Sequence, residues 1–169
     1  MILKNEENNM FREMRRSAQQ LSEEECIAIL NKCTNGVLSV NGDDGYPYGV
    51  PVSYAFQNGK IYIHGAKTGH KIDALKRSDK VTFTVIEMDD ILPKKFTTVY
   101  RSVIVFAKAR IMSDVNELID VLTMLGHKYS PGYEKQLPHE IETSLKSVSC
   151  IELTIEHMTG KQGKELLRK

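Results

Sequence analysis

Two segments of the sequence combine glycines, prolines and cations in a way that is typical of a ligand site. The first covers residues 45–52 and reads Gly-Tyr-Pro-Tyr-Gly-Val-Pro-Val. Prolines and glycine inside a strand remove backbone donors, which is found at edge strands, at bulges and where a planar ligand approaches the main chain. An edge strand that avoids aggregation is the alternative without a ligand.

The second segment covers residues 64–71 and reads His-Gly-Ala-Lys-Thr-Gly-His-Lys. It runs from the end of an expected strand into the start of an expected helix. Glycines permit close approach of a ligand, a helix N-terminus presents free amides, and Lys67, His70 and Lys71 add positive charge. The combination predicts a site for a phosphate monoester, although similar turns occur in proteins that bind no ligand.

Other chemistries find less support in the sequence. His64 and His70 are six positions apart with no third close ligand, so no metal site is predicted. The chain has no G-x-S-x-G motif, Walker loop or dinucleotide fingerprint, which disfavours hydrolases and nucleoside triphosphatases. Arg101 interrupts an apolar run and must reach either solvent or an anion, such as a ligand at a partner subunit.

Composition indicates one globular domain over residues 1–169, with an N-terminal arm or short helix in residues 1–20. The formal net charge is +1, so nucleic-acid and membrane partners are not expected. Residues 1–9 lack an apolar signal region and no run of about 18 apolar residues occurs, so we expect a cytoplasmic protein. Cys26, Cys33 and Cys150 form no C-x-x-C pair and are expected to be core thiols.

The elements expected to position these segments begin with a helix. Ser22 and Glu25 fit a capping box, which predicts a helix ending near Lys32. Strands are then expected over residues 37–40, 46–56 and 60–64, joined by turns that each contain Asn-Gly. These three strands would form a meander.

The second half alternates strands and helices. A helix over residues 69–77 would have Thr68 as its N-cap, and a helix starting near Asp114 would carry a leucine-rich stripe. The remaining expected elements are strands at residues 80–87, 97–111 and 148–155, a loop at 89–95, and helices at 139–145 and 159–169. The predicted fold class is mostly β with flanking helices, a six-stranded antiparallel barrel.

Taken together, these segments resemble the FMN-binding split-barrel proteins of the pyridoxamine 5′-phosphate oxidase superfamily, in the branch of the 5-nitroimidazole-resistance proteins. The resemblance covers roughly residues 24–161. The motifs that carry it, in order, are Gly36-Val-Leu-Ser39, Gly45-Tyr-Pro-Tyr-Gly-Val-Pro51, Lys60-Ile-Tyr-Ile-His-Gly-Ala66, Gly69-His-Lys-Ile-Asp-Ala-Leu75, Tyr100-Arg-Ser-Val103 and Thr159-Gly-Lys161.

The resemblance implies a homodimer with FMN in clefts lined by both chains. Carried over by motif, the residues along the flavin ring would be Tyr48, Gly49, Val50, Pro51 and Val52. The residues at the ribityl chain or ring would be His64, Gly65 and Ala66, and those around the phosphate would be Lys67, Gly69, His70 and Lys71. Arg101 and Ser102 would contribute from near the dimer interface.

The expected function is an FMN-dependent oxidoreductase that reduces small electron-poor compounds such as nitroimidazoles with a nicotinamide donor, with His64 as proton donor. The C-terminus lacks the arginine-rich signature of true pyridoxamine phosphate oxidases, so vitamin B6 oxidation is not expected. Alternatives are a non-catalytic flavin- or haem-binding module, with His64 or His70 as an axial haem ligand, and a structural homodimer with an empty cleft. FAD could replace FMN.

Overall fold

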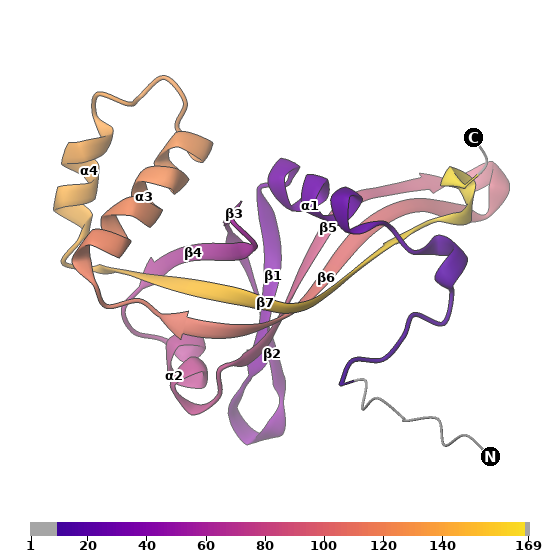
Figure 1. Cartoon of the computed structure of the whole chain (residues 1–169), viewed down its shortest axis with the longest axis horizontal. Helices are drawn as coiled ribbons and strands as arrows, with labels where there is room; N and C mark the ends of the chain where they lie inside the picture. The colour runs from indigo at the N-terminus through magenta and orange to yellow at the C-terminus, as the bar shows by residue number, and fades with distance from the viewer. Residues whose placement is uncertain (1–9, 168–169) are drawn as a thin grey trace, which may run out of the picture.

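A computed structural model describes residues 10–167 of the chain (Figure 1). The strands are β1 (Asn35–Asn41), β2 (Pro47–Ser53), β3 (Ala55–Gln57), β4 (Lys60–Ala66), β5 (Lys80–Leu92), β6 (Thr97–Ile111) and β7 (Val148–Gln162). The α-helices are α1 (Glu23–Lys32), α2 (His70–Arg77), α3 (Val115–Tyr129) and α4 (Leu137–Ser144). In this part of the chain, no helix is long and apolar enough to span a membrane.

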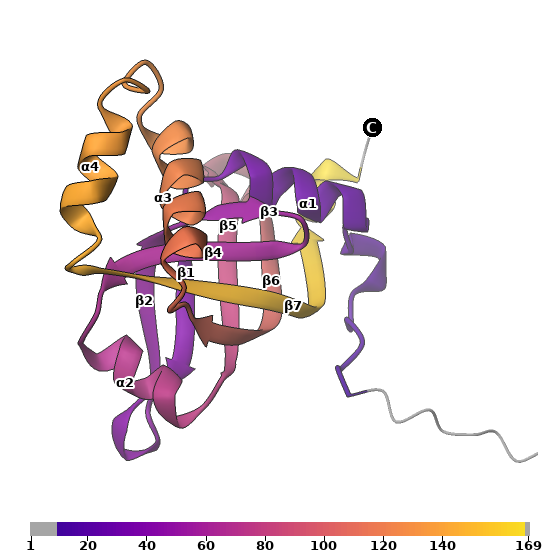
Figure 2. The same ribbon diagram turned by 60° about the vertical axis from the view of Figure 1, so that its left-hand side comes forward.

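The strands form one sheet in the order β2-β1-β5-β6-β7-β4-β3, and every neighbouring pair is antiparallel. β2 and β3 are the two edges, yet Tyr54 alone separates them in the chain. One residue spans only about 3.5 Å, so the sheet must roll until its edges are neighbours (Figures 1 and 2). This arrangement is consistent with a split barrel. The mostly β, antiparallel fold class is confirmed, but the count of six strands is wrong because the described residues form seven.

The additional strand comes from the stretch predicted as one strand over residues 46–56. Both predicted hairpins form, because β1 pairs with β2 and β3 pairs with β4. The chain turns at Tyr54 and changes edge between them, so they lie at opposite ends of the strand order and the continuous three-stranded meander is wrong. The Tyr54 side chain is buried, and its hydroxyl donates to the Leu30 carbonyl at 2.8 Å. We call Ser53, Tyr54 and Ala55 the seam.

α3 satisfies the backbone at the seam, where the sheet ladder cannot. The Tyr54 amide donates to the Tyr129 hydroxyl at 3.0 Å. The Tyr54 carbonyl accepts from that hydroxyl at 2.6 Å and from Lys128 Nζ at 3.0 Å. Lys128 also donates to the Cys33 carbonyl at 2.7 Å, and burial lowers its pKa. Because buried backbone groups need partners, α3 stabilises the break between the two edge strands.

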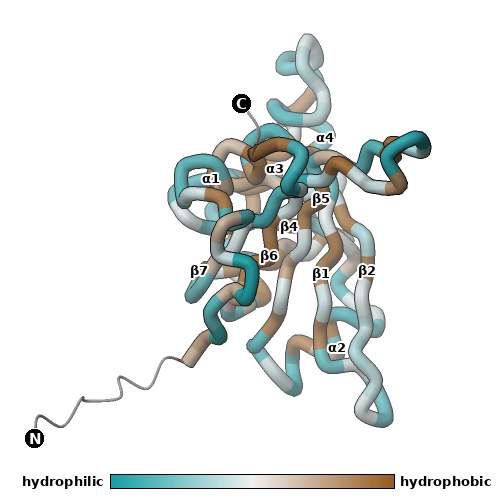
Figure 3. The backbone as a smooth tube through the Cα atoms, turned by 90° about the vertical axis from the view of Figure 1, so that its right-hand side faces the viewer, coloured by the Kyte–Doolittle hydropathy of each residue, from teal (hydrophilic) through white to brown (hydrophobic). Residues whose placement is uncertain are grey.

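The barrel interior is filled by the inward side chains of the strands and closed by α1. The largest fully buried members of this core include Tyr54, Phe83, Ile29, Leu30, Leu38, Ile61, Ile63, Ile151 and Leu153. Figure 3 shows hydrophobic stretches along the strands and hydrophilic ones in the turn between β1 and β2. The predicted capping box is confirmed, with the Glu25 amide donating to Ser22 Oγ and the Ser22 amide donating to Glu25 Oε2.

A second, smaller core lies between the sheet and the helical hairpin α3–α4. It contains Ala55, Met112, Leu118, Val121, Leu122, Leu125, Ile141, Val148 and Cys150. The two helices approach closely at Gly126, where an added Cβ would lie 2.3 Å from Leu137 Cδ1. Both ribbon views show α3 and α4 side by side, away from α2 (Figures 1 and 2).

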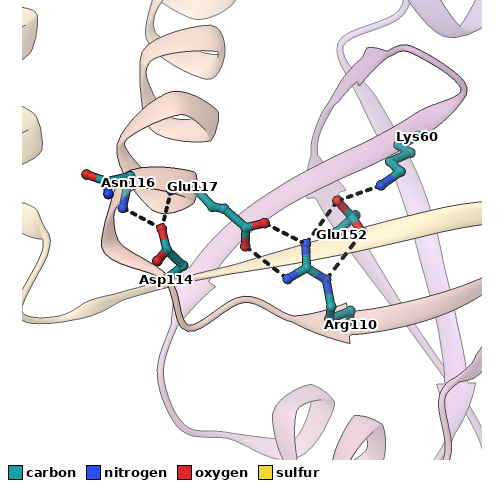
Figure 4. A network of polar contacts seen from close by, with 6 residues as sticks. All are labelled: Lys60, Arg110, Asp114, Asn116, Glu117 and Glu152. Carbon is teal, nitrogen blue, oxygen red and sulfur yellow. Dashed lines mark hydrogen bonds and ion pairs between the residues drawn. The ribbon is translucent and has the colours of Figure 1, made fainter.

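An ion network ties this hairpin to the sheet (Figure 4). Arg110 on β6 donates to Glu117 on α3 at 2.9 Å and to Glu152 on β7 at 3.2 Å. Lys60 on β4 adds a third ion pair, to Glu152 at 3.1 Å. Burial by itself would raise the pKa of Glu152, but hydrogen bonds from Arg110 and Lys60 outweigh it and lower the pKa.

Several predicted boundaries are wrong in the same direction, because strands extend further than their apolar residues suggest. β5 continues to Leu92, into the loop predicted at residues 89–95, since residues 88–92 pair with residues 97–101 of β6. The rest of that predicted loop, Pro93–Lys95, is a short 3-10 turn. β7 continues to Gln162, so the helix predicted over residues 159–169 is replaced by strand and a short 3-10 turn, Lys164–Leu166. Residues 168–169 of that prediction lie outside the described part.

The other local predictions fare unevenly. Residues 10–16 form no regular helix, and residues 1–9 of the predicted arm lie outside the described part. Gly69, with φ of +123°, is the N-cap of α2 in place of Thr68, a backbone conformation that glycine adopts readily. Cys26 and Cys150 are buried core thiols as expected, and burial raises the pKa of each to about 11. Cys33 is half-buried.

Candidate functional site

The two segments singled out in the sequence meet where β2 approaches α2. The rings of Tyr48 on β2 and His70 on α2 stack with centroids 4.1 Å apart and an interplanar angle of 20°. Asp43 lies beside this pair, with its Oδ2 at 3.5 Å from His70 Nε2 and its Oδ1 at 2.7 Å from Arg77 Nη2. The fold therefore brings together two segments that are about 20 residues apart in the chain.

The end of β4 and the start of α2 together form what we call the anion cradle, which consists of Gly65, Gly69, His70 and Lys71. The amides of Ile72 and Asp73 donate to the Gly69 carbonyl, whereas the first amides of a helix have no acceptor within the helix. A Cβ added at Gly65 would lie 2.9 Å from Lys71 Nζ, so the lysine ammonium packs against the bare backbone of β4. Lys71 forms no ion pair with any described residue.

β2 offers a flat edge beside the cradle. The side chains of Tyr48, Val50 and Val52 are half-buried against the barrel core, while Gly49 and Pro51 face outward. β2 pairs only with β1, and an edge strand leaves alternate backbone groups without a ladder partner. This is the geometry that a planar ligand with a polar edge requires.

His64 lies near the end of β4, between the cradle and the helical hairpin. It lines a groove of about 450 Å³, which we call the hairpin groove. The groove is lined by Ser53, His64, Leu122, Leu125, Gly126, Tyr129, Ser130, Leu137, Glu140, Ile141, Ser144 and Val148. Ala66 ends β4, where it pairs with Val148, and Lys67 lies in the exposed connection to α2.

Arg101 and Ser102 lie apart from these residues. Their strand, β6, is three strands from β2 in the sheet, about 14 Å at the usual spacing. Arg101 Nη1 is 3.2 Å from Glu87 Oε2, and its Nη2 is 3.1 Å from Glu25 Oε1. Its anions are therefore supplied within the chain. A role for Arg101 or Ser102 in ligand binding stays a prediction that requires a second copy of the chain.

Sequence reasoning missed the contributions of the seam and of the hairpin. Ser53, Tyr129 and Glu140 line the same groove as His64, although they are separated from it by 11 to 76 positions. No motif marks them, because each acts through its place in the tertiary structure. The proline- and glycine-rich stretch of residues 45–52 was the one local signal that the strand here is an edge.

Similarity to known proteins gives the family. Residues 22–162 match the family model described as pyridoxamine 5′-phosphate oxidase, which covers most of the chain. The chain belongs to this family, and the resemblance seen in its motifs is confirmed. A search of curated proteins found no match to the sequence.

Solved structures with similar folds include three of known origin. A conserved hypothetical protein from Mycobacterium tuberculosis is 19% identical with a TM-score of 0.79, over 93% of this chain and 94% of that chain. A candidate 5-nitroimidazole antibiotic resistance protein from Bacteroides thetaiotaomicron is 20% identical with a TM-score of 0.70, over 85% and 86%. An FAD- and haem-binding protein from Mycobacterium smegmatis is 18% identical with a TM-score of 0.74, over 86% and 74%.

Proposed function

We propose that this chain binds FMN and reduces small electron-poor compounds, nitroimidazoles among them, with a reduced nicotinamide as electron donor. The observation that carries the proposal is the anion cradle, where the Lys71 ammonium lies against Gly65 without a carboxylate partner in the described part of the chain. Family membership and the fold shared with flavin-binding proteins support the cofactor class.

The residues present fit a flavin monophosphate. Its phosphate carries nearly two negative charges and needs cations and amides, which Lys71, Lys67 and the first turn of α2 provide. The flavin ring needs a mostly apolar slot with a few polar groups at its edge. β2 is an edge strand with free backbone groups, and Gly49 and Pro51 add little side-chain bulk on its exposed face. Gly65 keeps the cradle open, because a side chain there would displace the Lys71 ammonium.

A bound flavin accepts two electrons from a nicotinamide donor and delivers them to an electron-poor acceptor. The chain's own residues bind and orient the reactants. His64 is the candidate proton donor because it lines the hairpin groove beside the β4 residues assigned to the flavin. No other histidine of the described chain lines that groove.

The cofactor is tested first. We expect the purified protein to be yellow, with absorbance near about 450 nm, and to release FMN on denaturation, identified by mass spectrometry. Titration with FMN, FAD and riboflavin should show FMN binding about 10- to 100-fold more tightly than riboflavin, since riboflavin lacks the phosphate. A protein that gains no thermal stability from FMN would refute the proposal. Release of haem in place of flavin would support the non-catalytic module.

Activity is tested separately on the loaded protein. Anaerobic oxidation of reduced nicotinamide should require both FMN and a nitroimidazole. His64→Ala, assayed at saturating FMN because His64 is also expected to contact the flavin, should lower the maximal rate by about 100-fold or more if His64 donates the proton. An equal rate in His64→Ala would remove His64 from the chemistry. Tight FMN binding without turnover would favour a sensor or storage role.

We also propose a homodimer, because the outer face of β5 and β6 exposes apolar side chains that have no cover in one chain. Ile86 and Ile104 are 63% and 41% exposed, and Ser102 pairs directly with Ile86 in the sheet. A stable dimer generally buries more than about 1,000 Å², and a second copy on this face would cover Ile86, Ile104 and the neighbouring Ser102. Sedimentation should show a dimer that Ile104→Lys weakens and Val115→Lys, on the exposed side of α3, does not. A monomer at micromolar concentration would contradict this.

A further inference from the structure

We propose that the hairpin groove is the binding site for the molecule that the flavin reduces, and that it selects small aromatic bases over anionic compounds. The inference rests on the proposed function, since it names the substrate class for the same site. It is carried by the position of the groove, by its walls and by its charge.

The groove adjoins the residues assigned to the cofactor. Ser53 at the end of β2 and His64 on β4 form its sheet side. The same two strands carry the flat edge at Gly49 and the cradle residue Gly65. A molecule in the groove would therefore contact His64 on the strand that also carries the cradle residue Gly65.

The walls are apolar and come mainly from the two helices. They are Leu122 and Leu125 on α3, Leu137 and Ile141 on α4, and Val148 at the start of β7. Binding sites for ring-bearing molecules are typically of this kind, apolar with a few polar groups that fix orientation. At about 450 Å³ the groove accommodates one or two aromatic rings.

The groove has few charged side chains. Among the described residues that line it, Glu140 is the one carboxylate, His64 is the one basic side chain, and none is lysine or arginine. Lys128 neighbours Tyr129 in sequence, but its ammonium is directed to the carbonyls of Cys33 and Tyr54. A carboxylate beside apolar walls attracts a cation and repels a phosphate ester or carboxylate.

The groove thus differs in charge from the anion cradle. The cradle holds Lys71 and His70, whereas the groove holds Glu140. Of these two sites, the cradle is the one that offers a lysine to a phosphorylated acceptor, and the cofactor phosphate occupies it under the proposed function. The acceptor is therefore expected to be a neutral or protonated aromatic base.

The test uses two probes with the same ring and opposite charge, 1-naphthylmethylamine and 1-naphthylacetate. Calorimetric titration is carried out on the FMN-loaded and the cofactor-free protein. We expect the amine to bind at least about tenfold more tightly than the acetate, in both forms. Equal binding of the two probes, or tighter binding of the acetate, would overturn the inference.

Three variants locate the binding site. Ser144→Trp fills the hairpin groove and should weaken amine binding by about tenfold or more. Thr123→Trp is the matched control. Thr123 lines a neighbouring hollow of the helical hairpin, so this variant should leave amine binding unchanged. Glu140→Gln, at an exposed position, should remove the preference for the amine even if Ser144→Trp fails to fold. Unchanged preference in Glu140→Gln would refute the charge argument.

The outcomes separate this inference from the proposed function. If the protein binds the amine but not FMN, the groove inference stands and the proposed flavin function is refuted. If the protein binds FMN but not the amine, the proposed flavin function stands and the groove inference is refuted. If the protein binds both FMN and the amine, we expect the amine to inhibit FMN-dependent turnover of a nitroimidazole competitively. Noncompetitive inhibition would mean that the acceptor binds elsewhere.

Discussion

Arg101 and Lys71, two cations expected from the sequence to serve the same ligand, lie in opposite surroundings. Arg101 is held by Glu25 and Glu87, and the Glu87 side chain is only 8% exposed. Lys71 has no carboxylate partner in the described chain and rests against the backbone of Gly65. A cation paired within the chain stabilises the fold, whereas one left without a partner is available to a ligand.

The position of Lys71 strengthens this contrast. It is the second residue of α2, so its ammonium lies at the positive end of the helix. A cation there destabilises a helix by about 0.3–1 kcal/mol, while Lys76 and Arg77 lie at the favourable end. An anion between α2 and β4 would turn this unfavourable arrangement into a favourable one.

The comparison is tested most strongly at Arg101. Arg101→Gln should lower the free energy of unfolding by about 2 kcal/mol, because the nearly buried Glu87 loses the guanidinium and keeps Lys32 Nζ, at 2.9 Å, as its charge partner. The affinity of the folded variant for FMN should stay within about threefold of the original. Urea unfolding and fluorescence titration measure the two quantities.

Lys108→Gln is the control on the same strand. Lys108 forms an exposed ion pair with Glu156 at 3.3 Å, which should contribute no more than about 1 kcal/mol. If Arg101→Gln keeps its stability but loses FMN, the arginine serves the ligand and the contrast with Lys71 fails.

Lys71→Gln should give the opposite pattern. FMN affinity should fall by about 10- to 100-fold, the usual contribution of a hydrogen bond to a charged phosphate, while riboflavin affinity stays unchanged. The cofactor-free protein should be equally stable or slightly more stable, since a cation leaves the helix N-terminus. Lys76→Gln, on the same helix, should retain FMN; equal losses in both variants would indicate a general charge effect.

Gly126→Ala tests whether the helical hairpin and the anion cradle act independently. The new Cβ would overlap Leu137, so α3 and α4 must move apart at a cost of about 1–2 kcal/mol. Thermal unfolding should show the loss, and binding of 1-naphthylmethylamine should weaken. FMN affinity should not change, and a parallel loss of FMN would mean that the two sites are coupled.

Acid should reduce the stability that the ion network around Glu152 gives the folded chain, and this is the smallest of the expected effects. Its pKa is lower in the folded chain than its usual 4.5, so the unfolded chain binds the proton more readily. The contribution is therefore complete above about pH 4.5 and is lost as pH falls through the folded pKa, by about 1 kcal/mol. Glu152→Gln should flatten the curve of stability between about pH 5 and pH 3; a curve as steep as that of the original chain would contradict this.

Much of the local structure could be predicted from neighbouring residues. The capping box at Ser22 and Glu25 gives α1, and Asp114 caps α3 by accepting from the amides of Asn116 and Glu117. The β-branched run of residues 97–111 matches β6. These features depend on contacts three or four residues apart, or on the preferences of single residues, so the order of amino acids defines them.

The extended ends of β5 and β7 could not be predicted in this way. Asp89, Asp90 and residues 160–162 have little strand propensity, but β6 between them supplies hydrogen-bond partners on both sides. Gly160 lies in this extension and lets α1 approach β7, since a Cβ there would be 2.4 Å from Cys26 Sγ. Ladder pairing outweighed local preference.

The anion cradle could be predicted from neighbouring residues, whereas the hairpin groove could not. Residues 64–71 are continuous, so sequence alone defined a cation-rich strand-to-helix turn with glycines, and this remains the part of the site closest to its prediction. The groove joins Ser53, His64 and Glu140 from three distant segments. It exists because the chain crosses from one sheet edge to the other at Tyr54, which Lys128 and Tyr129 stabilise from more than 70 residues away. The sequence determines short-range geometry and local charge, because these depend on neighbouring residues. Burial and long-range pairing depend on the rolled sheet, which brings distant segments and its two edges together.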